Sequence, residues 1–315
     1  MFIANLLKFN WYMPIIPRKW LRFLYRSEIL DSNNDISLPF ERDFFGMRYS
    51  GDINNVIDFH CYFYGAFEKG QLFFWSDIAE NLFNNNGVYV DIGANVGHHS
   101  IFMSKKSSFV HAFEPYEPVR KKIIEKINLN KLTNIIIHDV GIGDKDELLT
   151  FYEPTGANLG IGTFVEIENS SAPKKEFQLP VVSGDGYFNS KISNEINMIK
   201  IDVEGFEKYV ITGLYKIINK YRPVIVFELG LGLDCSFSSN IEINDSFPSN
   251  YVFYIFDIWD KFGNKDKRKD GILRKKGIYK LNTFNFDNLK EQADIIAFPR
   301  EQLEKFLKIF PDKFC

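Results

Sequence analysis

The ten residues VYVDIGANVG (88–97) constrain the fold most, because a run of apolar β-formers passes directly into two glycines. VYVDI has the composition of a buried strand, and we expect a helix to begin near Asn95. Glycine at such a junction lets the backbone come close to another group, which is either a ligand or a packed neighbour. The segment therefore predicts a strand–loop–helix unit at the ligand-binding edge of an α/β sheet.

Predicted strands alternate with helical patterns along the following chain, which indicates a doubly wound, mostly parallel sheet covered on both faces. These strands are 109–114, 135–139, 197–203 and 223–229. The last two, 251–259 and 294–299, are separated by a polar and basic stretch instead of a clear crossover helix. We therefore expect them to form an antiparallel pair at one edge of the sheet.

The sequence pattern predicts that the chain has two regions. Residues 1–85 form an N-terminal extension with a helical segment followed by short strands and a helix. Residues 86–315 form the main α/β domain, with an insertion around 142–182 that is rich in glycine and short β-like runs. The basic segment 261–280 is predicted to be a solvated loop, with a site for an anionic ligand as the alternative.

Composition excludes several classes of protein. A net charge of −3 and a pI of about 6.0 give no electrostatic reason to expect nucleic-acid binding. The three cysteines, Cys61, Cys235 and Cys315, are far apart and lack CxxC spacing. Such cysteines fit a reducing compartment and give no disulfide scaffold or zinc site. We therefore expect a cytoplasmic protein with no resident metal.

The first 26 residues are apolar, aromatic and basic, but polar residues and two prolines interrupt them. They are too interrupted to cross a bilayer, and they lack the basic start and small-residue cleavage site of a signal peptide. The favoured interpretation is a helical extension that packs on the body or on a partner chain. The alternative is contact of residues 1–26 with a membrane surface, which would make the protein membrane-peripheral.

The glycine pair indicates which ligand the first loop suits. Gly93 and Gly97 form Gly-x-x-x-Gly, which differs from the Gly-x-Gly-x-x-Gly of dinucleotide-binding proteins. Asp91 beside the loop suits an ammonium group better than a phosphate, and Asn95 adds a polar side chain. Glu114, 21 residues after Gly93, is placed to accept hydrogen bonds from ribose hydroxyls. S-adenosylmethionine fits these requirements; the alternative is a tight turn whose glycines only allow close packing.

A second concentrated signal is KIDVEG (200–205). Strand periodicity places Lys200, Asp202 and Glu204 on one face, where ionisable groups need partners or access to a crevice. Neighbouring carboxylates raise one another's proton affinity, which suits a general base. The alternative is an ion-pair network that only holds the end of the strand, and the two roles can coexist.

Three further polar residues are weaker candidates. His98 follows Gly97 in the first helical turn and is a candidate base, although most such histidines are simply packed. Asp139 ends a predicted strand, where it can meet an adenine amino group or cap a turn. Glu228 ends PVIVFEL at the same edge of the sheet and is a candidate substrate contact.

The chain resembles the FkbM-type family of S-adenosylmethionine-dependent methyltransferases. The motifs that carry the resemblance are GAFE (65–68), VDIGANVG (90–97), AFEP (112–115), INLN (127–130), VGIGDKD (140–146), KIDVEGFE (200–207), Gly213, RPVIVFE (222–228) and DIIAFP (294–299). DIGANVG and KIDVEG in this order are specific together. The chain departs from the family pattern at Ser183-Gly-Asp-Gly-Tyr187 and at Gly141.

The resemblance implies a class I methyltransferase fold, a Rossmann-like sheet of seven strands with an antiparallel last pair. It implies O-methylation of a hydroxyl on a sugar, glycan or natural product. Asp91, Gly93, Asn95 and Gly97 match the cofactor loop of the family, and Glu114 matches its ribose-binding acid. Asp202 and Glu204 match its active-site pair.

The expected chemistry is in-line transfer of a methyl group to a hydroxyl oxygen, with alignment of the reactants as the main contribution. Asp202, Glu204 or His98 is the expected proton acceptor, and a divalent metal held by Asp202 and Glu204 is the alternative. Three other functions stay open: a nicotinamide-dependent oxidoreductase on a similar sheet, a non-catalytic cofactor- or partner-binding relative, and an N- or protein-directed methyltransferase.

Overall fold

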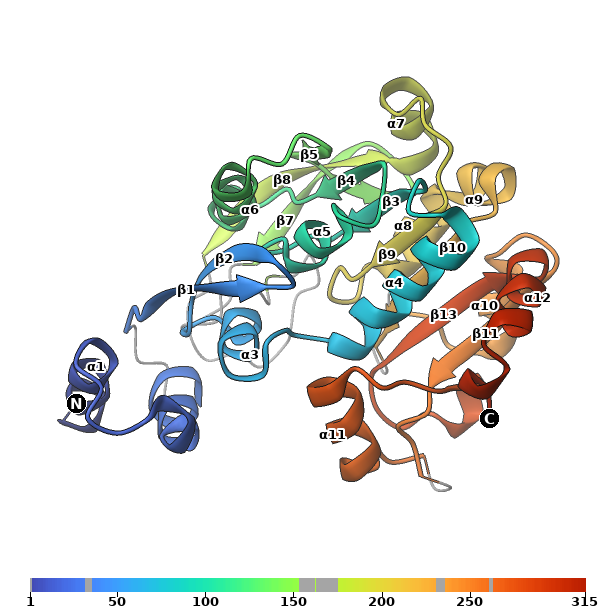
Figure 1. Ribbon diagram of the computed structural model, residues 1–315. Coiled ribbons are helices and arrows are strands. Elements are labelled where there is room, and N and C mark those ends of the chain that lie inside the picture. The colour runs from blue at the N-terminus through green and yellow to red at the C-terminus, as the bar shows by residue number, and fades with distance from the viewer. Residues whose placement is uncertain (1, 32–35, 153–161, 163–174, 231–235, 261–262) are drawn as a thin grey trace.

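The computed structural model of the chain describes residues 2–31, 36–152, 162, 175–230, 236–260 and 263–315. Its centre is an eight-stranded sheet whose strands lie in the order β12-β11-β13-β10-β9-β3-β4-β5 (Figure 1). In that order the strands are Leu281–Thr283, Tyr251–Phe256, Ala293–Pro299, Val224–Leu229, Met198–Ile201, Val88–Ile92, Phe109–Phe113 and Ile135–His138.

Neighbours from β10 to β5 pair in parallel, whereas β13 runs antiparallel to both β10 and β11. This arrangement confirms the predicted class I sheet with an antiparallel last pair. One difference is the count, since the short strand β12 adds an eighth strand beside β11. The order reverses between β3 and β9, so the crevice beyond their carboxyl ends is where such sheets bind ligands.

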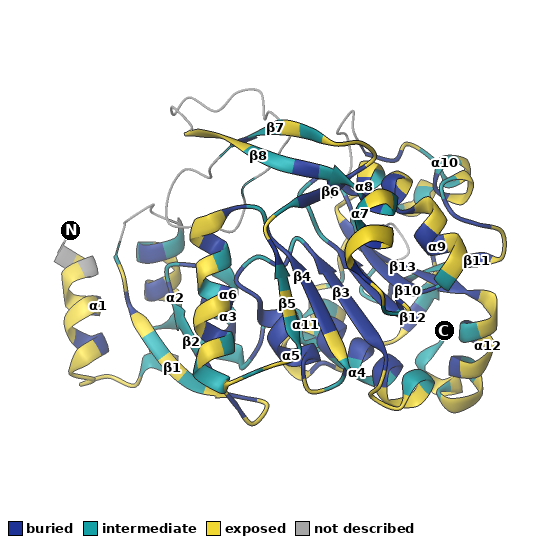
Figure 2. Ribbon diagram, turned by 90° about the horizontal axis from the view of Figure 1, so that it is seen from above, coloured by how far each residue is buried: buried dark blue, intermediate teal, exposed yellow. Residues whose placement is uncertain are grey.

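Helices cover both faces of the sheet, as Figure 2 shows by the dark blue of the strands between them. Beyond the N-terminal region they are α5 to α12, at His98–Met103, Glu117–Asn130, Gly184–Lys191, Glu207–Gly213, Tyr215–Tyr221, Asn240–Asp245, Lys267–Lys276 and Arg300–Ile309, with short 3-10 turns at Phe286–Asn288 and Pro311–Lys313. Alternate strand residues divide between the two faces. On β3, Val90 packs with the α8–α9 layer, whereas Tyr89 packs with Trp75 and the α4–α5–α12 layer.

The N-terminal region begins with helices and continues into a hairpin. Its elements are α1 (Phe2–Tyr12), a 3-10 turn (Arg18–Trp20), α2 (Arg22–Tyr25), a π-helix (Arg26–Asp31), the antiparallel strands β1 (Pro39–Phe44) and β2 (Met47–Asp52), α3 (Val56–Tyr64) and α4 (Lys69–Phe83). Figure 1 shows α1 and its neighbours at one end of the molecule, away from the main sheet. By contrast, α4 packs on the sheet through Leu72, Trp75 and Ile78, so it forms part of the sheet's covering layer.

A separate three-stranded sheet, in the order β6-β8-β7, lies within residues 141–183. Its strands are Gly141–Gly143, Glu176–Ser183 and Glu147–Tyr152, and β7 pairs antiparallel with β8. Residues 153–161 and 163–174 of the predicted insertion, which include its β-like run at 163–167, lie outside the described residues.

The prediction of a loop at 261–280 is wrong for residues 267–276, which form the helix α11, although no residue of this helix is buried. Asp266 caps this helix by accepting hydrogen bonds from the backbone N–H groups of Arg268 and Lys269, and Gly277 ends it with a φ of +71°. A capped run of lysine, arginine and leucine is a good helix former, although its net charge suggests a loop.

Candidate active site

The two glycine-containing loops meet at the point where the strand order reverses. Gly93 has a φ of +78°, and a Cβ atom placed on it would lie 1.8 Å from the carbonyl oxygen of Asp202. Ile92 accepts a hydrogen bond from the backbone N–H of Asp202 at 3.0 Å, which holds the two loops in register. Gly93 is therefore required by contact with a second loop, in addition to any ligand.

Glu114 stands directly behind the first loop. One of its carboxylate oxygens accepts a hydrogen bond from the backbone N–H of Asn95, and the other accepts one from Tyr116, both at 3.0 Å. Burial raises the pKa of Glu114 to about 7, although these two hydrogen bonds oppose the shift. Each oxygen retains acceptor capacity, so the carboxylate can still accept a hydrogen bond from a ligand hydroxyl.

Five of the predicted site residues line one cavity of about 70 Å³: Gly93, Asn95, Glu114, Asp202 and Glu204. Phe151 and Gly162 complete the wall on the side of the β6-β8-β7 sheet, and Gly162 is the single described residue between 152 and 175. This part of the cavity is smaller than the 300 Å³ or more of a typical ligand site, so it would hold only part of S-adenosylmethionine. Acceptor groups facing a glycine loop fit the hydroxyls of that molecule.

Asp91 is fully buried beneath the loop and does not line this cavity. Its Oδ2 accepts a hydrogen bond from the Ser100 hydroxyl at 2.6 Å, and its Oδ1 lies 4.0 Å from the Lys200 ammonium. Lys200 also donates a hydrogen bond to Asp202 at 2.8 Å. The ion-pair network, which the sequence offers as the alternative for KIDVEG, is therefore present alongside the cavity.

Electrostatics around Lys200 are dominated by carboxylates. Burial lowers the pKa of Lys200, but Asp202, Asp91 and Glu68 together raise it above its ordinary value. Burial also raises the pKa of Glu204 to about 8, with Asp202 adding to the shift. A single cation thus balances the charge of several carboxyl groups, so some of these groups can stay protonated near neutral pH.

The loop of Glu204 has an unusual backbone geometry and is held in place by Glu207. Glu204 has a φ of +53° and Gly205 a φ of +100°. Glu207 accepts hydrogen bonds from the backbone N–H groups of Val203 and Gly205 at 2.9 and 3.2 Å. The sequence predicted no separate role for Glu207, which is part of the KIDVEGFE motif. The structure shows that Glu207 holds the loop of Glu204 in place.

A second cavity of about 420 Å³ opens at the same edge of the sheet. Its lining includes the acids Glu68, Glu228, Asp270 and Asp294, the cations Lys265 and Arg274, and apolar side chains such as Phe67, Phe256 and Leu273. Burial is the main cause that raises the pKa of Glu68 to about 7 and that of Asp294 to about 8. Its volume and mixed lining are those of a small-molecule site.

Glu68 is the residue that sequence reasoning missed as a site residue, although GAFE belongs to the shared motifs. It occupies the left-handed region with a φ of +42° at the start of α4, and one of its carboxylate oxygens lies 2.9 Å from Nε2 of His99. Lys200, Asp202 and Asp91 act on its charge, so it connects the second cavity to the network around Lys200.

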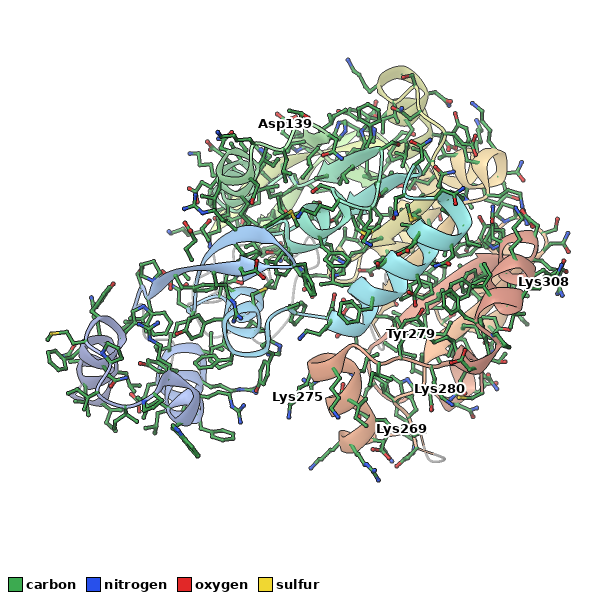
Figure 3. All side chains as sticks on the ribbon, viewed as in Figure 1. Asp139, Lys269, Lys275, Tyr279, Lys280 and Lys308 are labelled. Atoms are coloured by element: carbon green, nitrogen blue, oxygen red, sulfur yellow. The ribbon has the colours of Figure 1, made fainter. Side chains whose placement is uncertain are left out.

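Four predicted residues line neither cavity: Asp91, described above, and His98, Asp139 and Gly97. His98 is buried at the start of α5 against Phe67 and His99, and burial lowers its pKa well below the ordinary value. Asp139 is exposed at the end of β5, at the opposite side of the molecule from Lys269 and Lys275 on α11 (Figure 3). Gly97, with a φ of +81°, packs against Ile123 and begins α5.

Two groups of side chains place three potential metal ligands within 4.8 Å of one another: Glu68 with His98 and His99, and Asp202 with Glu207 and Glu228. Carboxylate sets such as the second suit hard divalent cations. One carboxylate of each group, Glu68 and Asp202, also acts on the charge of Lys200, whose ammonium would compete with a metal for it. The expectation of no resident metal stays a prediction.

Comparisons with known proteins match part of the chain. A family model described as the methyltransferase FkbM domain matches residues 91–256, more than half of the chain. The hexuronic acid methyltransferase AglP of Haloferax volcanii is 31% identical over 146 residues, 46% of this chain and 56% of that protein. Methyltransferase 1 of Beauveria bassiana is 25% identical over 151 residues, 42% of this chain and 60% of that protein. The chain thus spans less than two thirds of these relatives.

Solved structures give distant matches. The methyltransferase FkbM of Methylobacillus flagellatus KT has a TM-score of 0.40 at 13% identity, covering 70% of this chain and 48% of that one. TYW2 of M. jannaschii, solved with AdoMet, has a TM-score of 0.36 at 12% identity, covering 84% and 87%. The strand order of the main sheet, and not these scores, defines the fold. On the family match, this chain belongs to the FkbM family of S-adenosylmethionine-dependent methyltransferases.

Proposed function

We propose that the chain transfers a methyl group from S-adenosylmethionine to a hydroxyl oxygen of a sugar, glycan or related natural product. The observation that carries the proposal is that carboxyl groups with raised pKa line both cavities, Glu204 in the smaller one and Glu68 in the 420 Å³ one. A hydroxyl acceptor must lose a proton as its oxygen is methylated, so such groups suit a general base. The relative named as a hexuronic acid methyltransferase supports a sugar acceptor.

When bound, S-adenosylmethionine supplies a methyl group on a positively charged sulfur. Glu114 would accept hydrogen bonds from ribose hydroxyls, and Gly93 and Asn95 would present backbone to the nucleoside. The adenine contact of Asp139, the ammonium contact of Asp91 and the loop role of Gly97 remain predictions about the same ligand. These residues bind and orient, which is the larger part of the expected rate enhancement.

The proton would pass from the acceptor hydroxyl to a carboxylate at the cavity. Glu68 is the strongest candidate because it lines the cavity and has a pKa near neutrality. Asp202 and Glu204, the predicted pair, lie on the cofactor side, where Lys200 balances their charge. We assign His98 a packing role, since it is buried against Phe67 and lines neither cavity.

The test is a transfer assay with radiolabelled S-adenosylmethionine over nucleotide sugars, lipid-linked glycans and polyketide alcohols. A hexuronic acid offers both hydroxyl and carboxylate oxygens, and brief alkali separates them, since a methyl ester releases methanol and a methyl ether does not. Alkali-stable product supports the proposal. Methylation of nitrogen or of protein, or cofactor binding without transfer to any acceptor, contradicts it.

Variants assign the roles. We expect Glu68→Gln and Asp202→Asn to lower kcat by about 10²- to 10⁴-fold while S-adenosylmethionine still binds. Glu304→Gln, an exposed change on α12, is the matched control. Dialysis against a chelator tests the metal alternative, for which the structure groups Asp202 with Glu207 and Glu228 instead of the predicted Glu204. If activity disappears and returns with Mg²⁺, a metal at these residues activates the acceptor in place of a carboxylate base.

A further inference from the structure

Exposed apolar side chains gather at the N-terminal end of the molecule. Of 21 exposed large apolar residues in the described part of the chain, ten lie between residues 3 and 24. They are Ile3, Leu6, Phe9, Tyr12, Met13, Ile15, Ile16, Trp20, Phe23 and Leu24. We call this set the N-terminal apolar surface. Isolated exposed apolar residues are ordinary, but a contiguous group in one short segment marks an interaction site.

The segment that carries this surface is packed and internally ordered. Leu7, Trp11 and Tyr25 are buried in a small core with Ile29 and Phe59, and the rings of Trp11 and Tyr25 meet edge to face at 5.5 Å. The Asn10 side chain accepts hydrogen bonds from the backbone N–H groups of Ile15 and Ile16. The apolar residues outside this core are thus exposed on an ordered segment, and Figure 2 shows the exposed residues of α1 in yellow.

Charge identifies the partner. Residues 3–24, which carry the surface, contain four lysine or arginine residues and no aspartate or glutamate; the nearest acids, Glu28 and Asp31, lie on the π-helix that follows. Lys8 is exposed on α1, and the guanidinium of Arg22 lies over the Phe23 ring at 4.9 Å, so cations border the apolar side chains. Aromatic and aliphatic residues bordered by cations are the composition of a surface that lies on an anionic bilayer.

Two other modes of association fit less well. No helix in the described residues is long and apolar enough to cross a membrane, so the segment would lie on the surface. A second copy of the chain would bring two cationic surfaces together, which like-charge repulsion opposes. Trp20 and Phe23, each 72% exposed, are the residues best placed to enter the headgroup region.

We propose that the N-terminal apolar surface docks this protein on membranes that carry anionic lipid. The buried core beneath it includes Phe59 of α3, and α3 ends four residues before Glu68 of the 420 Å³ cavity. Docking therefore holds the part of the chain that leads into the cavity close to the bilayer. The proposal concerns binding alone and stands whether or not the methyl acceptor is a sugar.

The experiment is sedimentation of the full chain with vesicles of phosphatidylcholine alone and with vesicles of phosphatidylcholine and phosphatidylglycerol in equal parts. We expect binding to the anionic vesicles only, weakened at high salt because screening reduces the electrostatic part. Trp20→Ser with Phe23→Ser should lower binding by at least about tenfold. Lys8→Gln with Arg22→Gln should weaken binding and reduce its salt dependence.

The matched control is Ile241→Ser with Leu148→Ser, which removes equally exposed apolar side chains elsewhere (74% and 67%) and should leave binding unchanged. Retained S-adenosylmethionine binding shows that each variant is folded. The proposal fails if neither vesicle binds the chain, or if the Trp20 and Phe23 variant binds as well as the parent. It also fails if light scattering finds a dimer that this variant abolishes, since the surface then serves a second copy.

Discussion

The Lys200 ammonium lies 2.8 Å from Asp202, two residues further along the same strand end, and 4.0 Å from Asp91 on the neighbouring strand. One buried cation thus joins β9 to β3 at the point where the sheet order reverses. Removing one partner from such a network leaves buried charge uncompensated, which destabilises a protein far more than the loss of a surface pair.

We expect Lys200→Met to lower the free energy of unfolding by about 3–5 kcal/mol. Denaturant titration measures the change, with the exposed Lys276→Met as the matched control. Adding Asp91→Asn to the Lys200 variant should restore part of the loss, because it removes one of the uncompensated acids. Additive losses in the double variant would show that the two residues do not interact.

Gly93→Ala tests the contact between the two loops. The substituted residue would keep a φ of +78° and bring its Cβ to 1.8 Å from the Asp202 carbonyl oxygen, so one loop must move. We expect a loss of stability of more than about 2 kcal/mol and weaker S-adenosylmethionine binding. Gly271→Ala on α11, where a Cβ meets nothing within 4 Å, should change stability by less than about 1 kcal/mol in the favourable direction. Equal effects of the two substitutions would rule out a special constraint at Gly93.

Stability should fall as pH rises from about 6.5 to 8.5. Five acids have pKa values of about 7 to 8 in the folded chain, mainly through burial, against 3.8 to 4.5 when unfolded: Glu68, Glu114, Glu204, Glu207 and Asp294. The folded state then holds protons that the unfolded state has released, so raising the pH favours unfolding.

Histidines act in the opposite direction at lower pH. Burial lowers the pKa of His60, His111 and His138 from 6.5 to about 4. Their contribution to the free energy of unfolding therefore increases as pH rises to 6.5 and is constant above it. Chemical denaturation across the range should therefore show its clearest fall above about pH 6.5. Glu114→Gln should reduce that fall and Glu304→Gln should not. A flat profile between pH 6.5 and 8.5 would show that the acids are not protonated in the fold.

Gln292→Trp tests whether the 420 Å³ cavity receives the methyl acceptor. Gln292 is an exposed residue of its lining, so an indole there narrows the entrance without disturbing the core. Once an acceptor is known, we expect its KM to rise by about tenfold while the Kd of S-adenosylmethionine is unchanged. Glu291→Trp, its exposed neighbour outside the lining, is the control. A raised Kd for S-adenosylmethionine with an unchanged KM would assign the cavity to the cofactor instead.

Sequence patterns predicted the sheet well because its strands are specified locally. VYVDI, FVHAF and PVIVFEL are each apolar except for one residue, and each is followed by a glycine or an acidic residue. Local signals also explain the failure at α11, where the density of charge suggested a loop and the Asp266 cap with Gly277 makes a helix. The capping signal was present in the sequence but was outweighed by composition.

The candidate site was predicted in part. Gly93, Asn95, Glu114, Asp202 and Glu204 do line one cavity, because parallel strands bring their carboxyl ends to the same edge. Glu68 was missed because its position depends on how α4 crosses the sheet. The orientation of the Asp91 side chain could not be predicted from the sequence either, since Ser100 and Lys200 contact its carboxylate from two different elements.

By itself, the sequence determined the parallel strands of the main sheet, the glycines and acids at their ends, and the family. Those depend on the alternation of side chains along a strand and on turn chemistry, which act over a few residues. Tertiary structure alone decided which carboxyl groups share the Lys200 cation and which keep a proton, since both depend on burial and on distances between residues far apart in the chain. It also decided that the N-terminal helices bury Trp11 and expose Trp20, because that choice depends on the surface against which they pack.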